Sequence, residues 1–352
     1  MQDADARAGS LRLLGRAAVN SLCALHPALA ERRVSEAVSR GVPARLRRLR
    51  IPGFQYALVV GDRPVVSAAL GVAHGSTGEA MTVASRFRVA SLSKPVAALV
   101  LLQAAARGEL DADATIEPYV PEWDWSGARR PVTVRRLLRH DAGLPTLHPT
   151  HVRDDEPAVL KMEGVPGVGG TRGYSGLNYV AAQLAAERMT GVTFEQMAAR
   201  HVFEPLGMEG TGFGGASREG TVGFHDEVGR ELPRMWSPAL AGSGLVATAA
   251  QIATILREAM RAMRGLGSVI AREAACEVLV PRDGAPFACG LAVAESPDVR
   301  THGGVRPGYR GFIIVDLRVR VGCVLLANGE YGGEVNRPVS GLVADLAARL
   351  RA

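Results

Sequence analysis

Segments with the pattern of β-strands lie near both ends of this 352-residue sequence, and helix-like segments lie between them. The first two strand-like segments are joined by a Gly61-Asp62-Arg63-Pro64 turn, which predicts a hairpin. Strands near both termini with helices between them favour one sheet that draws on both ends of the chain. We therefore predict an α+β fold, an α/β sandwich whose antiparallel sheet is flanked by helices and interrupted by an inserted all-helical lobe. The predicted strands are 54–60, 65–72, 288–294, 312–316 and 322–327.

The order of these segments divides the chain into three predicted parts. Residues 1–44 form an N-terminal helical segment, 45–115 and 241–352 form the sheet domain, and 116–240 form the inserted helical domain. One helix start is marked by Thr248, because Gln251 three residues later completes a capping box. Pro338 suits the first turn of a closing helix. The predicted helices in the second part of the chain are 133–139, 178–190, 193–202, 248–264 and 339–351.

Ser91 and Lys94 stand three residues apart at the predicted start of a helix that Gly108 ends. Residues three apart share a helix face, so the Ser91 hydroxyl and the Lys94 amine can touch. Pro95 fits only the first turn of a helix, which places Ser91 at the N-terminus. A neutral amine can take the proton of a serine hydroxyl, and a helix N-terminus favours the negative charge formed in acyl transfer. Ser-x-x-Lys also occurs in many unrelated helices, so the spacing alone leaves the chemistry open.

The chain uses arginine almost everywhere that it needs a basic side chain. Of its 41 Lys and Arg residues, only Lys94 and Lys161 are lysines. A guanidinium keeps its proton at neutral pH, whereas a buried ammonium can lose it. Lysine at position 94 therefore suits a residue that gives up and takes back a proton, although chance also places single lysines.

The net charge of +6 is concentrated in residues 32–50, which hold seven arginines against Glu36 alone. Apolar residues recur there every three to four positions, so we interpret this segment as a helix with a solvated basic face. A basic helix can also bind an acidic partner, a membrane surface or nucleic acid. No aromatic residues interleave with these arginines, so we expect no nucleic-acid binding.

Targeting and metal-binding signals are weak. The apolar run 95–106 is too short to span a bilayer, and the N-terminus Met-Gln-Asp-Ala-Asp is acidic where a secretory signal is basic. We expect a cytoplasmic protein without stable membrane insertion. The four cysteines lie far apart without metal-ligand spacing, which predicts free thiols and no metal site.

Several motifs in a fixed order resemble the serine β-lactamase and penicillin-binding-protein superfamily. The branch with class C β-lactamases, family VIII esterases and D-specific peptidases is the most similar, over roughly residues 45–350. This resemblance implies a β-lactamase/transpeptidase-like fold and an acyl-enzyme mechanism that needs no metal or organic cofactor. The matching segments are 87–95 with Ser91 and Lys94, 133–144, Tyr174-Ser175, 203–208, 241–250 and His302-Gly303-Gly304.

The resemblance implies a role for each matching residue. Ser91 would be the nucleophile, and Lys94 would share its proton. Tyr174 would be the partner base, with a phenol pKa lowered by Lys94, since an ammonium stabilises a phenolate. The backbone N–H groups of Ser91 and Val305 would form the oxyanion hole. We interpret His140 as structural, because a histidine at a helix C-terminus interacts favourably with the helix dipole.

The substrate-binding residues implied by the resemblance include two departures from it. His302 stands where relatives often have lysine; it would bind a substrate carboxylate or shuttle a proton near neutral pH, unless it only bonds neighbouring backbone. Gly303 and Gly304 would let the backbone approach the substrate. Gly176 stands where class C enzymes have asparagine, and Asn178 can replace that amide only if the backbone turns it inward.

These departures favour an esterase, amidase or acyltransferase over a β-lactamase. The leading expectation is a serine hydrolase that acts through an acyl-enzyme on a small ester, amide or peptide substrate, with β-lactamase or D-peptidase activity left open. An acyltransferase or peptide cyclase would use the same acyl-enzyme but exclude water from its second step. A catalytically silent ligand-binding relative is the third alternative, and the oligomeric state is left open.

Overall fold

The structure of the chain, a computed structural model, describes residues 27–128, 130–145, 173–214, 220–233, 241–282 and 284–351. Residues 1–26 of the predicted N-terminal segment lie outside this description, as do stretches of the predicted inserted domain at 146–172, 215–219 and 234–240. The domain boundaries therefore stay a prediction.

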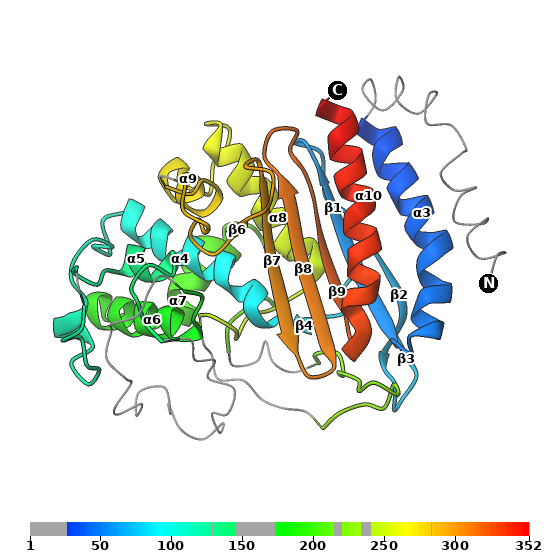
Figure 1. The fold of residues 1–352 in the computed structure, drawn as a ribbon, viewed down its shortest axis with the longest axis horizontal. Coiled ribbons are helices and arrows are strands. Elements are labelled where there is room, and N and C mark those ends of the chain that lie inside the picture. The colour runs from blue at the N-terminus through cyan, green and yellow to red at the C-terminus, as the bar shows by residue number, and fades with distance from the viewer. Residues whose placement is uncertain are drawn as a thin grey trace.

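A seven-stranded antiparallel sheet, in the order β3-β2-β1-β9-β8-β7-β6, forms the central layer of the molecule (Figure 1). β1 pairs with β9 from Phe54 opposite Ala327 to Val60 opposite Val321. The sheet is therefore built from both ends of the chain, as predicted. Its strands are β1 (Gly53–Val60), β2 (Val66–His74), β3 (Glu79–Ala80), β6 (Ala292–Val293), β7 (Val299–Arg306), β8 (Tyr309–Asp316) and β9 (Val321–Ala327).

The central strands bury both of their faces. Alternate residues of a strand point to opposite sides of a sheet. Phe54, Tyr56 and Leu58 of β1 belong to the core under the first and last helices of the described chain. Ala57 and Val59 belong to the core on the opposite face of the sheet, under the helices from the middle of the chain. Every residue of β1 and β9 is buried, which explains why both strands are apolar apart from Gln55 of β1.

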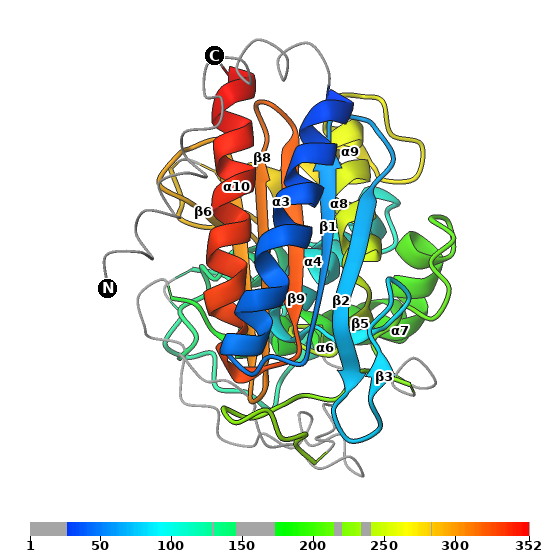
Figure 2. The same cartoon turned by 90° about the vertical axis from the view of Figure 1, so that its right-hand side faces the viewer.

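Two helices from opposite ends of the chain, α3 (Pro27–Arg48) and α10 (Gly333–Arg351), cover one face of the sheet side by side (Figure 2). Val34, Val38, Val42 and Leu46 of α3 are buried against it. The arginines of this segment lie on the outer side, which confirms the predicted solvated basic face. Those that are exposed are Arg32, Arg33, Arg40, Arg47, Arg48 and Arg50.

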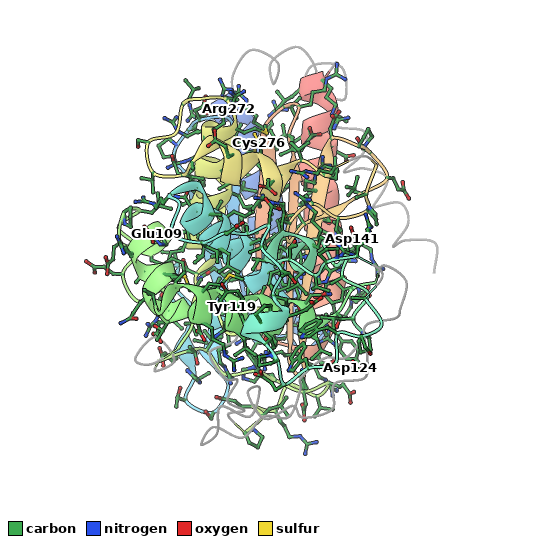
Figure 3. The ribbon with its side chains drawn as sticks, turned by 90° about the vertical axis from the view of Figure 1, so that its left-hand side faces the viewer. Glu109, Tyr119, Asp124, Asp141, Arg272 and Cys276 are labelled. Carbon is green, nitrogen blue, oxygen red and sulfur yellow. The ribbon has the colours of Figure 1, made fainter. Side chains whose placement is uncertain are left out.

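Helices on the opposite face form a second layer and a lobe beyond it, which Figure 3 shows from the helical side, with Glu109 and Tyr119 in front of the strands. The helix α4 lies inside this layer, and its residues from Ser93 to Ala104 are all buried. No helix in the described part of the chain combines the length and apolarity needed to cross a membrane. The helices are α4 (Ser93–Ala106), α5 (Val134–Leu138), α6 (Gly176–Thr190), α7 (Phe194–Ala198), α8 (Ala249–Met263) and α9 (Arg272–Leu279).

Two predicted elements have different bounds in the structure. The predicted strand 288–294 is reduced to β6, because Gly290 has a φ of +89° and turns the backbone away from an extended path. The closing helix α10 begins at Gly333, so Pro338 lies inside it and not in its first turn. The earlier start lets Val335 join Val339 and Val343 in the core, at a spacing of one helical turn.

The predicted capping box at the start of α8 is confirmed. Thr248 Oγ1 accepts the Gln251 N–H at 3.2 Å, and Gln251 Oε1 accepts the Thr248 N–H at 2.9 Å. Gln55 of β1 accepts the Ala249 N–H at 2.6 Å, which ties the helix start to the centre of the sheet. These bonds satisfy N–H groups that the helix itself leaves without partners.

We expect Thr248→Ala to lower the free energy of unfolding by about 1 kcal/mol, because the half-buried Gln251 N–H loses its side-chain acceptor. Thr248→Ser keeps the hydroxyl and should retain most of the stability. Urea denaturation of both variants measures the difference. An equal loss in the serine and alanine variants would contradict a capping role.

Candidate active site

Ser91 lies on a turn that two backbone segments hold in place. The strand β4 (Phe87–Arg88) pairs with β5 (Val246–Ala247), and just after β4 the Val89 N–H donates to the Leu245 carbonyl at 3.0 Å. The buried Ser93 hydroxyl donates to the Ala90 carbonyl at 2.6 Å and accepts the Leu245 N–H at 3.0 Å. Ala90 has a left-handed φ of +50°, a conformation that residues other than glycine rarely adopt. The surrounding bonds thus fix a strained turn, and strain of this kind is typical of functional sites.

Lys94 places its amine beside Ser91 in the interior. The turn η1 (Ala90–Leu92) carries Ser91, and Lys94 is the second residue of α4. Lys94 Nζ lies 3.2 Å from Ser91 Oγ and donates to the Gly242 carbonyl at 2.9 Å. The side chain is 2% exposed. Burial, helped by the positive charge of Arg306, lowers the pKa of Lys94 to about 7.

The Tyr174 hydroxyl is the second polar group beside Ser91, after the Lys94 amine. This hydroxyl is hydrogen-bonded to Ser91 and lies 3.5 Å from His302 Nε2. Burial raises the pKa of Tyr174, and the bond to Ser91 works in the opposite direction with a smaller effect. The predicted lowering of this pKa by Lys94 is therefore wrong, because desolvation of the phenolate is the largest effect and the buried Lys94 itself has a pKa lowered to about 7.

His302 is a neutral imidazole at physiological pH. The side chain is 6% exposed, and burial together with the charge of Lys94 lowers the pKa of His302 to about 3. A hydrogen bond with the Gly290 backbone acts in the opposite direction and does not compensate. Neither a fixed charge for a substrate carboxylate nor a protonation change near neutral pH is supported for this residue.

Asn178 and His140 lie behind Tyr174 and not beside the serine. Asn178 is 1% exposed, and its amide nitrogen lies 2.9 Å from His140 Nδ1. The same His140 atom accepts the Ser175 N–H at 3.3 Å, and the His140 ring packs 4.6 Å from the Tyr174 ring between centroids. Asn178 thus does not turn inward to replace the missing amide, and Gly176 is the buried first residue of α6. His140 follows the C-terminus of α5, as predicted, and supports Tyr174 through ring packing and through its contacts with Ser175 and Asn178.

The short strand β6 covers only part of β7, so the rest of β7 has no strand beside it on that side within the described chain. The Val299 carbonyl accepts the Ala294 N–H, so alternate residues from Val299 onward direct their N–H and C=O groups toward this edge. Pairing with β6 involves only Arg300 and Thr301 of β7 within the described chain. The N–H of Val305 therefore points to the edge past β6, and its side chain is 64% exposed.

Glycines allow β7 and its neighbours to approach the serine turn. A Cβ on Gly304 would lie 2.7 Å from the Val89 carbonyl oxygen and 3.0 Å from Leu92 Cγ. A Cβ on Gly290 would lie 2.6 Å from Pro95 Cα. Gly303 has nothing within 4 Å of such a position. Gly304 and Gly290 are thus required by packing, and Gly303 is not.

Three groups that shape the surroundings of Lys94 were not predicted from the sequence: the Gly242 carbonyl, Gly290 and Arg306. Each acts across a long sequence separation, and only the segment 241–250 was marked, by its resemblance to relatives. Arg306 shares a side of β7 with His302, four residues away, and that spacing is the one signal that pointed to it. In the described residues no group of three His, Cys, Asp or Glu side chains is placed to hold a metal ion.

Residues 34–348 match the Beta-lactamase family, and the chain therefore belongs to that family.

Curated relatives share shorter stretches of sequence. The chain is 29% identical over 140 residues to penicillin-binding protein 4* of Bacillus subtilis (strain 168), which covers 36% of this chain and 30% of that protein. It is 34% identical over 102 residues to esterase EstB of Burkholderia gladioli, covering 28% of this chain and 26% of the esterase. The chain thus spans about a third or less of the length of these two relatives.

Solved structures share the fold over most of the chain. The octameric penicillin-binding protein homologue from Pyrococcus abyssi has a TM-score of 0.71 at 18% identity, covering 84% of this chain and 74% of that one. A beta-lactamase/D-alanine carboxypeptidase from Pseudomonas syringae has a TM-score of 0.73 at 16% identity, covering 89% and 99%. At these identities the likeness establishes the fold.

We expect Gly304→Ala to lower the free energy of unfolding by about 2 kcal/mol, since the new methyl group meets backbone at the serine turn. The neighbouring Gly303→Ala adds a methyl group in open space, so its effect should stay below about 1 kcal/mol in either direction. Chemical denaturation of the two variants compares them directly. Equal losses would show that Gly304 is not held against the serine turn.

Proposed function

We propose that this protein is a serine hydrolase that acts through an acyl-enzyme on a small ester or amide, without a metal or organic cofactor. The observation that carries this proposal is the buried Lys94 amine, 3.2 Å from Ser91 Oγ and with a pKa of about 7. At neutral pH a large fraction of such an amine is unprotonated and can accept the serine proton. An ordinary lysine, with a pKa of about 10.4, would be almost wholly protonated there.

In the first step the Ser91 hydroxyl proton moves to Lys94 Nζ while Ser91 Oγ bonds to the carbonyl carbon. The carbonyl electrons move to its oxygen, which the N–H groups of Ser91 and Val305 stabilise. When the bond to the leaving group breaks, that group takes a proton that Lys94 returns through the Tyr174 hydroxyl. Because the pKa of Tyr174 is raised, it relays the proton as a neutral phenol rather than serving as a phenolate base.

Water completes the reaction in the second step. It attacks the acyl carbon, gives a proton to Lys94, and the proton returns to Ser91 Oγ as the carboxylic acid leaves. Hydrolysis restores the starting enzyme, so no other reactant is required.

The polar groups around the site favour an uncharged ester over a β-lactam. Gly176 supplies no amide for an acyl-amide side chain, and the buried Asn178 points to His140. A neutral His302 offers no charge to a substrate carboxylate. The similarity to esterase EstB agrees with this preference, whereas the similarity to penicillin-binding protein 4* keeps peptide amides as the second substrate class.

Intact-protein mass spectrometry tests the nucleophile. Wild type, Ser91→Ala and Lys94→Arg would each be incubated with an activated short-chain ester, a penicillin and a fluorophosphonate. We expect one adduct per wild-type chain, no adduct on Ser91→Ala, and at least about 100-fold slower acylation of Lys94→Arg, because arginine cannot accept a proton.

Full turnover by Ser91→Ala would overturn the proposal. No adduct on wild type from any reagent would favour a catalytically silent ligand-binding protein. Transfer of the acyl group to an added amine in preference to water would instead favour an acyltransferase.

The pH dependence of acylation tests which group is the base. The neutral amine of Lys94 is the active form, so the rate should fall about tenfold per pH unit below pH 7 and level off above it. Stopped-flow acylation by an ester whose own ionisation lies outside this range measures the profile. A rate that keeps rising far into the alkaline range would identify Tyr174 as the base instead.

A further inference from the structure

Arg306 is a second cationic side chain, and it lies close enough to Lys94 for its charge to act on the amine. It extends from the same side of β7 as His302 and Gly304, because alternate strand residues share a side. Its Nη2 donates to the Ser243 carbonyl at 3.3 Å, and Lys94 Nζ donates to the preceding carbonyl, that of Gly242, at 2.9 Å. Two consecutive carbonyls thus hold two basic side chains from different parts of the chain.

The groups that the structure describes around Lys94 supply no negative charge for this pair. In the part of the chain that the structure describes, neither Lys94 nor Arg306 forms an ion pair with a carboxylate. Burial raises the pKa values of Tyr174, Tyr179 and Cys289, and His302 is neutral, so none of these groups is charged at pH 7. The titratable or hydroxyl groups that the structure describes around Lys94 include Ser91, Tyr174, Tyr179, Cys289, His302 and Arg306. The His140 ring packs against both tyrosine rings.

We propose that Arg306 is a positioning residue for the reaction: its fixed positive charge keeps the Lys94 amine neutral and able to accept the Ser91 proton. The catalytic part of this inference depends on the proposed role of Lys94 as the base, whereas the electrostatic coupling of the two side chains does not.

The two cations respond differently to their mutual repulsion. A guanidinium keeps its proton even when buried, whereas an ammonium beside it can lose one. The pair therefore relieves its repulsion at Lys94, which adds to the effect of burial. After Lys94 has taken the serine proton the repulsion returns, which favours passing that proton on to the leaving group.

The scarcity of lysine makes the coupling directly measurable. Protein labelled with ¹³C at the lysine ε-carbon has two signals, and Lys161→Arg leaves that of Lys94 alone. Its chemical shift against pH gives the pKa of Lys94 without any substrate. We expect Arg306→Gln, which keeps an N–H donor for the Ser243 carbonyl, to raise this pKa by about 0.5 to 1.

Arg300→Gln is the matched control, because Arg300 lies on the same side of β7, is 4% exposed and is also held by backbone carbonyls. It sits six residues away from Arg306, roughly 20 Å along the strand, and should leave the Lys94 titration unchanged. Arg306→Met, similar in length and uncharged, provides a second test if the glutamine variant does not fold. A Lys94 titration that stays at the wild-type pH in both Arg306 variants would overturn the proposal, as would an equal shift in Arg300→Gln.

Acylation kinetics then connect the titration to the reaction. In Arg306→Gln the acidic limb of the pH profile of acylation should shift to higher pH together with the Lys94 titration. The KM for an uncharged ester should change little. An unchanged limb with a raised KM for carboxylate-bearing esters alone would show that Arg306 binds substrate instead. If the titration moves but the acidic limb does not, the coupling holds and the proposed function of Lys94 as the base fails.

Discussion

The burial of one amine, that of Lys94, is the constraint on which the arrangement of this site depends. A buried ammonium is unfavourable unless charges compensate it, and here the surroundings supply a carbonyl, two aromatic rings and a second cation. The side chain therefore loses its proton readily. The same low polarity keeps Tyr174 protonated and His302 neutral, so a single environment sets the ionisation of all three groups.

The site is assembled from segments that lie far apart in the sequence. Ser91 and Lys94 come from the start of α4, Tyr174 from the turn before α6, and His302 from β7. Close packing brings these segments together, because Gly290 and Gly304 leave no room for a side chain between backbones. The His140 ring packs against the Tyr174 ring, and Asn178 bonds to His140.

Local sequence patterns predicted the elements that local forces determine. The strands that became β1, β8 and β9 and the capping box of α8 follow from apolar runs and from one Thr–Gln pair. The short extent of β6 and the start of α10 depend instead on contacts with distant segments, which local patterns do not contain. Ser91, Lys94, Tyr174 and His302 were expected together from resemblance, and the structure brings them together. The direction of the Tyr174 pKa shift was wrong because the depth of burial is a property of the whole fold.

The pairing of β1 with β9 has a consequence for the order of events during synthesis. Strand β1 (53–60) can pair with β9 (321–327) only after nearly the whole chain has been synthesised. Forming this central pair of strands therefore closes a very long loop. Folds dominated by such distant contacts form slowly. Ser91 emerges from the ribosome long before the Gly242 carbonyl and Arg306 exist to adjust its neighbour Lys94. A nascent chain therefore holds Ser91 and Lys94 without the groups that set the ionisation of Lys94, and that environment is complete only once the late strands have joined the sheet.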